Sequence, residues 1–315
     1  MPLSREQTQA RLDLLASGTL AHTPSQTYTV ADRIEEQAAA QAERTFLLFG
    51  DTSITYAEFN ALANRVAHVL KASAGLKAGD VVAVMIENRP EFIAAWAGLA
   101  KLAVTAALLN TNTRGAALSH AIAETGARAL IVGAECIDAA DGALKENPGL
   151  PVYLLEDPAQ PSDETRTAAA LPADWTSLDR LMDQASTQNP DPEVRRDLKA
   201  GDDLFHVFTS GTTGLPKAAR LSHMRFLGVG DGMSAIAGYG PDDVIACILP
   251  LYHGAAGMVV VSCALSQGAA IMIRRRFSAS RFWDDVRRYR VTGCQYIGEV
   301  CRYLVNRPPA TGDRD

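Results

Sequence analysis

Apolar residues along the chain alternate between short continuous runs and longer stretches with helical spacing. Residues 81–86 are continuously apolar, which is typical of a strand covered on both faces of a sheet. Residues 56–71 instead carry apolar side chains three and four positions apart, which predicts a helix with one buried face. Residues 90–101 predict a second helix, because proline in a first helical turn loses no hydrogen bond. Strand and helix in alternation favour an α/β fold around a mostly parallel sheet.

The same pattern predicts elements along most of the chain. Further strands are expected at residues 46–49, 53–55, 104–109, 129–132, 203–209, 244–249, 269–273 and 292–297. The first two would form a hairpin around Gly50-Asp51. Further helices are expected up to residue 124 and at residues 178–185, 222–237, 255–266, 280–289 and 298–306. Residues 157–200 are rich in Pro, Asp, Ser, Thr and Ala, which predicts a solvated connection with one short helix.

Composition places the 315 residues among ordinary globular proteins, with 47% hydrophobic and 21% charged residues. The net charge of −6 argues against nucleic acid as the main partner, because phosphate backbones attract basic surfaces. Arginine gathers near the C-terminus, where residues 271–315 hold ten arginines and five acidic residues. We interpret this stretch as a solvated helix face, with an anion-binding or membrane-surface patch as the alternative.

The cysteines and the N-terminus indicate the compartment. Five cysteines occur without a C-x-x-C pair or zinc-ligand spacing, and most lie in apolar stretches, where a free thiol behaves as a small hydrophobic group: Cys136, Cys247, Cys263, Cys294 and Cys301. The six histidines form no metal cluster, so no metal ligand is assigned. The N-terminus lacks the apolar core of a secretory signal, and no apolar run reaches the roughly 20 residues that span a bilayer. We expect a cytoplasmic protein, with peripheral membrane contact left open.

The clearest candidate chemistry follows the predicted strand at 203–209. An apolar run leads into hydroxyl residues, two glycines and one lysine: Thr209, Ser210, Gly211, Thr212, Thr213, Gly214 and Lys217. Glycine lets successive backbone N–H groups point at one place, and hydroxyl groups add donors for phosphate oxygens. Lys217 would supply a compact positive charge. The spacing differs from a Walker A loop, and the plain alternative is a flexible turn with an exposed lysine.

Several motifs together resemble one superfamily. Residues 209–217, Thr-Ser-Gly-Thr-Thr-Gly-Leu-Pro-Lys, resemble the phosphate loop of the adenylate-forming enzymes, which include acyl-CoA synthetases, luciferases and nonribosomal peptide adenylation domains. Ala218-Ala219 after the lysine is similar to the branch of very-long-chain acyl-CoA synthetases and fatty acid transport proteins. Leu249-Pro-Leu-Tyr-His253, with Gly257 beyond it, resembles the motif at the acyl-binding end. Other segments resemble that branch or the family's early helices: residues 56–64, 88–92, 277–284 and 295–304.

This resemblance implies a fold and a reaction. The fold would be the multilayer αβαβα large N-terminal domain of an adenylate-forming enzyme, incomplete at its C-terminal end. Residues 1–28 would be an N-terminal extension, residues 29–315 a partial AMP-binding domain, and the C-terminal lid domain would be absent. The reaction would be ATP-dependent activation of a long- or very-long-chain fatty acid to acyl-AMP, followed by displacement of AMP by coenzyme A. A mixed anhydride gives the unreactive carboxylate a good leaving group.

The resemblance also assigns roles to residues. Residues 209–214 would hold the β- and γ-phosphates, Lys217 would offset their charge, and Mg²⁺ would lie beside them. His253 would lie near the carboxylate and AMP, with Tyr252 at the entrance of the acyl pocket. The small residues Gly254, Ala255, Ala256 and Gly257 would leave room for a long chain. Without the resemblance, a histidine that satisfies a helix terminus is the favoured interpretation of His253. Glu299 fits a helix-start carboxylate rather than a catalytic group.

Two short matches are interpreted as coincidence, and three family motifs are missing. Gly228-Val-Gly230-Asp-Gly232 lies inside a predicted helix, which is the wrong context for a dinucleotide loop. Thr311-Gly312-Asp313 follows two prolines in a polar tail. The family's adenine motif, hinge and catalytic lysine do not occur, so we expect an inactive or weakly active chain. The alternatives are a non-catalytic nucleotide- or fatty-acid-binding module and an enzyme that activates another carboxylic acid.

Overall fold

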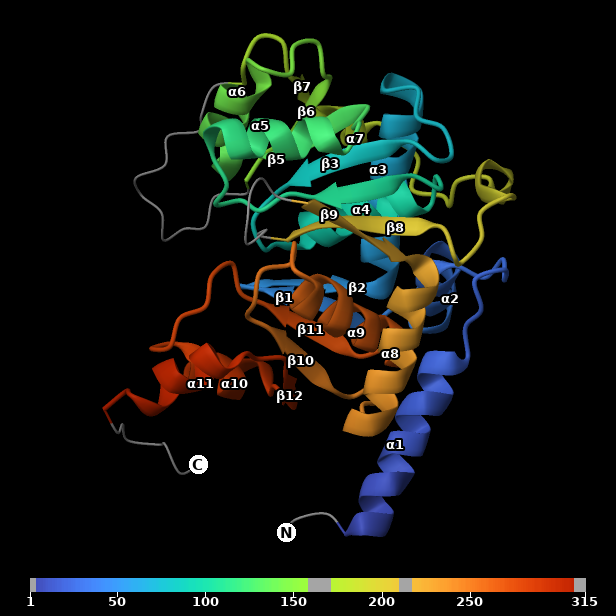
Figure 1. The fold of residues 1–315 in the computed structure, drawn as a ribbon, viewed down its shortest axis with the longest axis vertical. Coiled ribbons are helices and arrows are strands. Elements are labelled where there is room, and N and C mark those ends of the chain that lie inside the picture. Colours follow the sequence, from blue (N-terminus) through green and yellow to red (C-terminus); the bar gives the residue numbers. More distant parts are fainter. Residues whose placement is uncertain (1–3, 158–170, 210–216, 309–315) are drawn as a thin grey trace.

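Two sheets stacked one above the other form the frame of the computed structural model, which describes residues 4–157, 171–209 and 217–308 (Figure 1). The upper sheet has seven strands in the order β7-β6-β5-β3-β4-β8-β9, and the lower sheet has five in the order β12-β10-β11-β1-β2. All neighbouring strands are parallel except β1 with β2 and β8 with β9. The predicted mostly parallel, multilayer α/β fold is therefore confirmed.

The seven-stranded sheet contains most of the predicted continuous apolar runs. Its strands are β3 (Val81–Met85), β4 (Thr105–Leu108), β5 (Ala129–Gly133), β6 (Val152–Leu155), β7 (Thr176–Ser177), β8 (Asp203–Thr209) and β9 (Lys217–Ser222). β4, β5 and β6 are buried throughout, because helices cover both faces of this sheet. Register places Leu108 of β4 opposite Val207 of β8, and Thr209 opposite Lys217.

The five-stranded sheet begins with the predicted hairpin. Its strands are β1 (Thr45–Phe49), β2 (Thr52–Thr55), β10 (Val244–Cys247), β11 (Ala270–Ile273) and β12 (Gly293–Cys294). Gly50 has a φ of 60°, the left-handed conformation that a tight turn requires and that glycine adopts without strain. The predicted strand at residues 292–297 is wrong beyond Cys294. Tyr296 and Ile297 are exposed, and the chain turns there into a helix.

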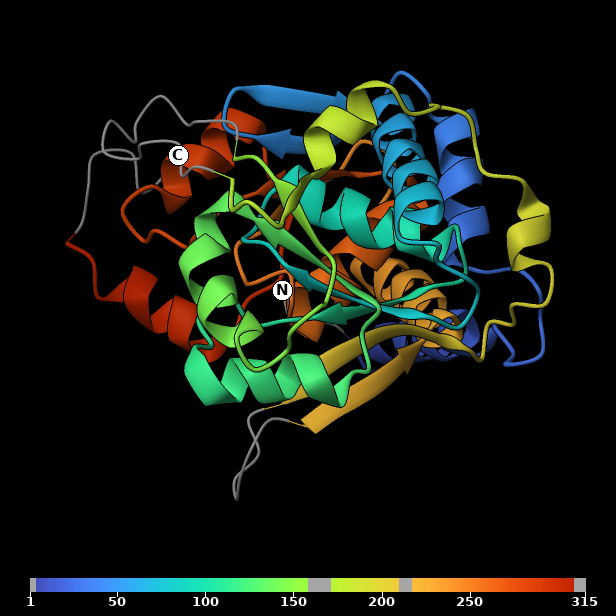
Figure 2. The same ribbon diagram turned by 90° about the horizontal axis from the view of Figure 1, so that it is seen from above.

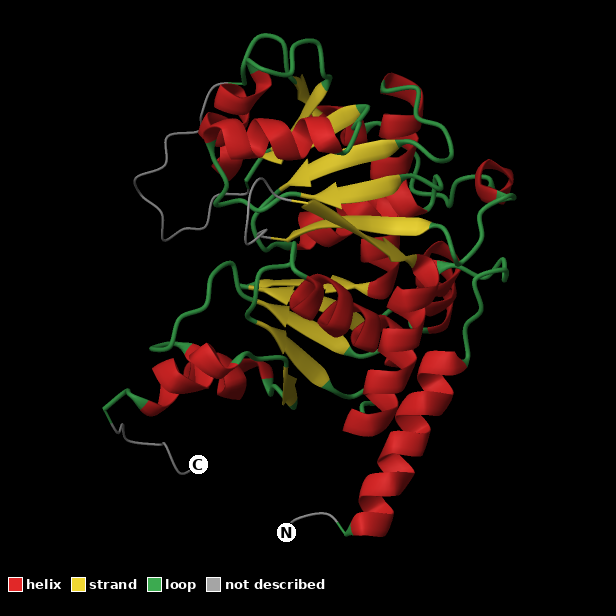
Figure 3. Ribbon diagram, in the orientation of Figure 1, coloured by secondary structure: helices red, strands yellow, loops and turns green. Residues whose placement is uncertain are grey.

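Helices separate and cover the sheets (Figure 3). They are α1 (Arg5–Leu20), α2 (Val30–Ala40), α3 (Tyr56–Ser73), α4 (Pro90–Ala100), α5 (Gly115–Glu124), α6 (Ile137–Leu144), α7 (Leu178–Asp183), α8 (His223–Ala237), α9 (Val261–Gln267), α10 (Phe282–Tyr289) and α11 (Gly298–Val305). Short 3-10 segments lie at Ala134–Cys136 and Pro192–Arg195, and a π-helix, η3, spans Gly254–Val260. α3 begins where Thr55 and Glu58 form a capping box.

The core fills the space between the two sheets and continues onto the outer face of the upper sheet. Trp96 of α4 packs edge-on against Phe205 of β8 and Phe226 of α8, with ring centroids 5.1 and 5.6 Å away. α5 and α6 cover the opposite face of the upper sheet (Figure 2). Alternate residues of β3 serve the two sides, since Val82 and Val84 face one core and Ala83 and Met85 the other.

Residues 157–200 were predicted to form a solvated connection, and this prediction is wrong for the second half of the segment. β7 pairs with β6 at the edge of the upper sheet, and Trp175, Leu178 and Met182 are buried. The predicted short helix occurs as α7. Polar composition concealed these contacts, because a two-residue strand and one helical turn need only a few apolar anchors.

Glycines in α8 serve helix packing, which explains the apparent dinucleotide motif. A methyl group on Gly228 would come within 2.8 Å of the Thr19 carbonyl oxygen in α1, and one on Gly230 within 2.6 Å of the Ser262 carbonyl oxygen in α9. Gly232 likewise faces Thr19. Close backbone approach to α1 on one side of α8 and to α9 on the other therefore accounts for the spacing.

Most C-terminal arginines of the described residues form ion pairs with acidic groups of the fold. Arg274 pairs with Asp285 at 2.8 Å, and Arg275 pairs with Asp157 at 2.6 Å. Arg288 pairs with Asp51 in the β1–β2 turn. These pairs favour the solvated-surface interpretation over an anion patch. In the described part of the chain, no helix combines the length and apolar character needed to cross a membrane.

Candidate active site

Residues that follow strands of the two sheets meet at one edge of the molecule. Asn88, just after β3, donates from Nδ2 to the carbonyl oxygens of Leu249 (2.8 Å) and Arg274 (3.1 Å), which follow β10 and β11. These contacts bring the carboxyl ends of three parallel strands together. In open α/β sheets, ligands bind outside the carboxyl ends of the strands, so this edge is the first place to look for a site.

The segment from Leu249 to His253 lies at this edge. Leu251 and Tyr252 are buried, whereas His253 reaches the surface and is covered only in part. The Tyr252 hydroxyl accepts a hydrogen bond from Asn112 Nδ2 at 3.2 Å. Asn112 follows β4, and β4 is the neighbour of β8, whose last residue is Thr209. Contacts among described residues therefore link the predicted acyl-binding motif to the strand beside the one that leads into the predicted phosphate loop.

His253 precedes the π-helix η3 without capping it through its side chain. Its carbonyl oxygen accepts hydrogen bonds from the backbone N–H of Ala256 (3.1 Å) and Gly257 (2.8 Å). The imidazole makes no capping hydrogen bond to the described helix. The interpretation of this side chain as a satisfied helix terminus is therefore wrong, because the backbone fulfils that task. π-helical turns are rare and occur frequently at functional sites.

The surroundings of His253 favour its neutral form. Partial burial lowers the pKa of His253 below its ordinary value, because a charged imidazolium loses hydration there. The Tyr252 ring lies beside it, with ring centroids 4.7 Å apart. Burial raises the pKa of Tyr252, so its hydroxyl stays protonated at neutral pH. Both side chains can therefore act as neutral hydrogen-bonding groups.

The two glycines assigned to the acyl pocket have different surroundings. A methyl group on Gly254 would meet no atom of the described chain within 4 Å, so this position opens onto space. A methyl group on Gly257 would lie 1.9 Å from the Leu251 carbonyl oxygen. Gly257 is thus explained by close packing of η3 against the Leu249–His253 turn, whereas Gly254 has no such contact.

The predicted phosphate loop is described only at its two ends. Thr209 ends β8, Lys217 begins β9, and the two residues pair in antiparallel register. Lys217 is exposed. Five of the residues assigned to phosphate binding lie outside the described residues: Ser210, Gly211, Thr212, Thr213 and Gly214. The pairing of Thr209 with Lys217 anchors both ends of the segment at the carboxyl end of β8.

A small apolar cavity of about 50 Å³ lies behind the π-helix. Its walls come from α8, β10, η3 and α9, and include Met233, Ile245, Val259 and Cys263. Burial raises the pKa of Cys263 to about 11, so its thiol is unreactive and serves as an apolar wall. The cavity therefore offers apolar surface on the inner side of the segment that begins at His253.

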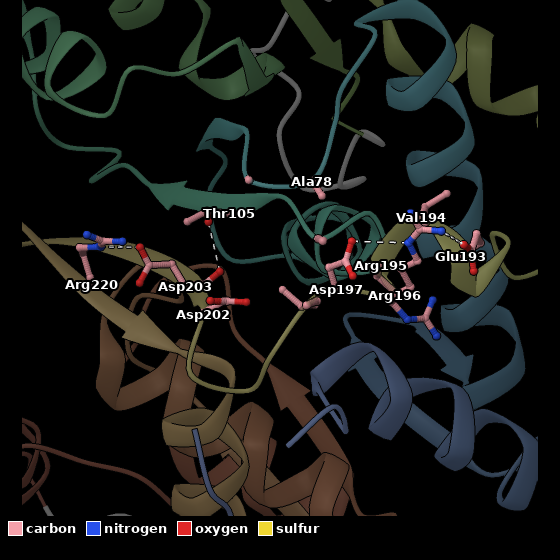
Figure 4. A pocket seen from close by; sticks show the side chains of 13 residues that line it. Ala78, Thr105, Glu193, Val194, Arg195, Arg196, Asp197, Asp202, Asp203 and Arg220 are labelled. Carbon is pink, nitrogen blue, oxygen red and sulfur yellow. Dashed lines mark hydrogen bonds and ion pairs between the residues drawn. The ribbon is translucent and has the colours of Figure 1, made fainter. Parts of the chain in front are cut away.

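A larger hollow of about 300 Å³ lies at the opposite edge of the upper sheet (Figure 4). Thr105 and Asp203, which begin β4 and β8, line it, and Thr105 Oγ1 donates to the Asp203 carbonyl oxygen at 3.1 Å. Asp203 forms an ion pair with Arg220 in this hollow. Asp203 lies six residues before Thr209, about 20 Å along an extended strand. This hollow is therefore separate from the edge that carries the motifs.

Asn88 and Asn112 are polar residues whose contacts the sequence did not reveal. Asn88 stood within a recognised motif, but its partners lie 161 and 186 residues away in the chain. Asn112 carried no motif at all. Their position directly after buried parallel strands is the one signal that could have found them, because such positions gather at the ligand-binding edge.

Comparison with known proteins gives consistent relatives. The chain matches the model of the AMP-binding enzyme family over residues 34–314. It is 35% identical over 293 residues to long-chain fatty acid transport protein 6 of Mus musculus, covering 91% of this chain and 44% of that protein. It is 36% identical over 303 residues to the medium/long-chain-fatty-acid–CoA ligase FadD6 of Mycobacterium tuberculosis, covering 95% of this chain and 46% of that protein.

A solved structure shares the fold of this chain. The N-terminal domain of FACL13 from Mycobacterium tuberculosis superposes with a TM-score of 0.73 at 24% identity, covering 89% of this chain and 66% of that chain. At this identity the likeness shows the shared fold alone. The chain spans less than half the length of the two curated relatives.

Proposed function

Because the chain belongs to the AMP-binding enzyme family, we propose that it carries the ATP- and fatty-acid-binding part of a fatty acid–CoA ligase. The family recognised from the phosphate-loop and acyl motifs is confirmed. ATP would bind at the segment between Thr209 and Lys217, and the carboxylate of a long-chain fatty acid would bind at Tyr252 and His253. The observation that carries this proposal is the Tyr252–Asn112 hydrogen bond, which ties the acyl motif to the strand beside β8.

The residues would act mainly by positioning and by charge stabilisation. A carboxylate and the ATP phosphates repel each other, so a positive charge at Lys217 would lower the barrier to their approach. A neutral His253 can donate one hydrogen bond to the carboxylate without taking its charge, which keeps the oxygen nucleophilic. Holding the two groups in one orientation supplies much of the rate enhancement in such a transfer.

No residues of this chain are assigned to binding Mg²⁺ or coenzyme A. Mg²⁺ would arrive bound to the ATP phosphates, since magnesium in such sites is held largely by substrate phosphates and water. It would supply further charge compensation there. Coenzyme A would be the thiol substrate, in line with the name of the FadD6 relative.

The fatty acyl chain would pass Gly254 and enter the apolar cavity behind η3. At about 50 Å³, the cavity holds only a small part of a long acyl chain. Binding would therefore require the η3 wall to move. A π-helix is suited to such movement, because its wide turn is less stable than an α-helical one.

Titration calorimetry of the 315-residue chain with ATP·Mg²⁺ and with hexadecanoic acid tests the proposal. We expect both ligands to bind, Lys217→Ala to weaken ATP at least tenfold, and His253→Ala to weaken the acid. Lys199→Ala is the matched control, because Lys199 is also an exposed lysine and lies near the opposite edge, next to the 300 Å³ hollow. Equal loss of ATP affinity in Lys199→Ala and Lys217→Ala, or no binding of either ligand, would contradict the proposal.

A further inference from the structure

Glu87, Asn88 and Arg89 follow β3 and together connect the two sheets at the candidate site. Asn88 makes the contacts to the lower sheet. Asn88 is buried, and its side chain makes three hydrogen bonds to the lower-sheet segments. Nδ2 donates to the carbonyl oxygens of Leu249 and Arg274 at 2.8 and 3.1 Å, and Oδ1 accepts from the Leu251 N–H at 2.7 Å. One side chain thus satisfies three backbone groups that leave β10 and β11.

The chemistry of this arrangement requires an amide. An asparagine side chain has two N–H donors and one carbonyl acceptor on a short stem, which matches two carbonyl oxygens and one N–H. An aspartate of the same shape would face both carbonyl oxygens with a negative charge. Buried backbone groups without partners are unfavourable, so the three groups depend on Asn88.

The residues on either side fix Asn88 to the upper sheet. Arg89 is fully buried and donates to the carbonyl oxygens of Glu156 (2.6 Å) and Leu155 (3.2 Å) at the end of β6. The Glu87 N–H donates to the Glu135 carboxylate at 2.7 Å, just after β5. Asn88 therefore projects from a segment held on both sides, and its position is set by β5 and β6.

We propose that Asn88 is a positioning residue that sets Tyr252 and His253 relative to the carboxyl edge of the upper sheet. The held atom, Leu251 N, lies one residue before Tyr252 and two before His253. The Leu251 carbonyl oxygen in turn faces Gly257 in η3. Asn88 thus controls the turn that carries both side chains. On the proposed function, it controls where the fatty carboxylate lies against the ATP phosphates.

Asn64 of α3 provides a matched control within the same chain. Its side chain is also buried, and its Nδ2 donates to the Thr187 carbonyl oxygen at 2.8 Å and to Asn189 Oδ1 at 2.9 Å. These partners lie in the segment between α7 and β8 and do not contact the Leu249–His253 turn. Loss of the Asn64 amide therefore removes comparable buried hydrogen bonds without touching the candidate site.

The test compares Asn88→Ala, Asn88→Ser and Asn64→Ala in the 315-residue chain. The first measurement is the pKa of His253 by NMR titration, which needs no ligand. We expect Asn88→Ala to raise it toward the ordinary histidine value, since a loosened turn removes the partial desolvation that lowers the pKa of His253. Asn88→Ser keeps one donor and one acceptor, so a smaller rise is expected. Asn64→Ala should leave the His253 titration unchanged.

The second measurement separates the two ligands by calorimetry. We expect Asn88→Ala to weaken hexadecanoic acid at least tenfold and ATP·Mg²⁺ less than threefold, with Asn88→Ser between it and the parent chain. Equal shifts in Asn88→Ala and Asn64→Ala would overturn the proposal, as would an unchanged His253 titration in both Asn88 variants. If the parent chain binds neither ligand, the proposed function fails, while the His253 titration still decides the positioning role.

Discussion

Replacing Gly257 by alanine should destabilise the fold through one defined contact. The new methyl carbon would lie 1.9 Å from the Leu251 carbonyl oxygen, a distance that real side chains essentially never show. The backbone fixes the position of the methyl carbon and the oxygen belongs to the backbone, so rotation of a side chain cannot relieve the clash. Leu251 is fully buried and its N–H is held by Asn88, which limits its movement. Overpacking of this kind costs about 1–3 kcal/mol.

Gly254→Ala is the matched control for this prediction. It adds the same methyl group three residues earlier in the same π-helix, where no atom of the described chain lies within 4 Å. Alanine restricts the unfolded chain more than glycine does, so a gain of about 0.5–1 kcal/mol is expected. The two variants should therefore shift stability in opposite directions.

Urea unfolding followed by circular dichroism measures the difference. A loss of ~2 kcal/mol lowers the unfolding midpoint by about 0.7–1 M for a slope of about 2–3 kcal/mol per M. We expect this shift for Gly257→Ala and an unchanged or slightly raised midpoint for Gly254→Ala. Equal midpoints for the two variants would refute the assignment of Gly257 to backbone packing.

Three further substitutions test other parts of the fold. Burial would raise the pKa of Asp231, but hydrogen bonds from Arg33, Ser266 and His22 lower it to about 2. The charged form of Asp231 should therefore stabilise the fold by about 2 kcal/mol above pH 4. Urea unfolding should therefore show Asp231→Asn less stable than the parent at pH 7, with the difference shrinking as pH falls from about 4 toward 2. Gly232→Val would clash with Thr19, and limited proteolysis should then cut α1 faster. Trp96→Ala should cost about 3–5 kcal/mol in the same unfolding assay, because it empties a fully buried aromatic cluster.

Most strands of the core could be predicted, because burial on both faces demands an uninterrupted apolar run, but β6 was missed although it is equally buried. β3, β4, β5 and β8 all lie within a residue or two of their predicted limits. β9 was not predicted, because Lys217–Ser222 has no apolar run and only partial burial. β9 forms a strand because its backbone pairs with β8, and its own side chains carry no pattern that would predict this pairing.

The packing of the N-terminal helix and the contacts between the two sheets could not be predicted from the sequence. The apolar and polar positions of α1 are not segregated onto opposite faces, and none of its residues is buried. It packs on α8 through glycine contacts at Gly228 and Gly232 instead. The motif at the candidate site could be recognised from residue types, whereas the role of Asn88 could not. Its three partners become neighbours only after both sheets have formed.

Hydrogen–deuterium exchange of the 315-residue chain decides whether the two motifs form one site. ATP·Mg²⁺ should slow exchange at residues 209–219, and hexadecanoic acid should slow exchange at residues 249–260, with both ligands together protecting each segment further. Protection confined to the hollow beside Thr105 and Asp203, or none at residues 209–219 with saturating nucleotide, would contradict the placement of ATP at the carboxyl end of β8.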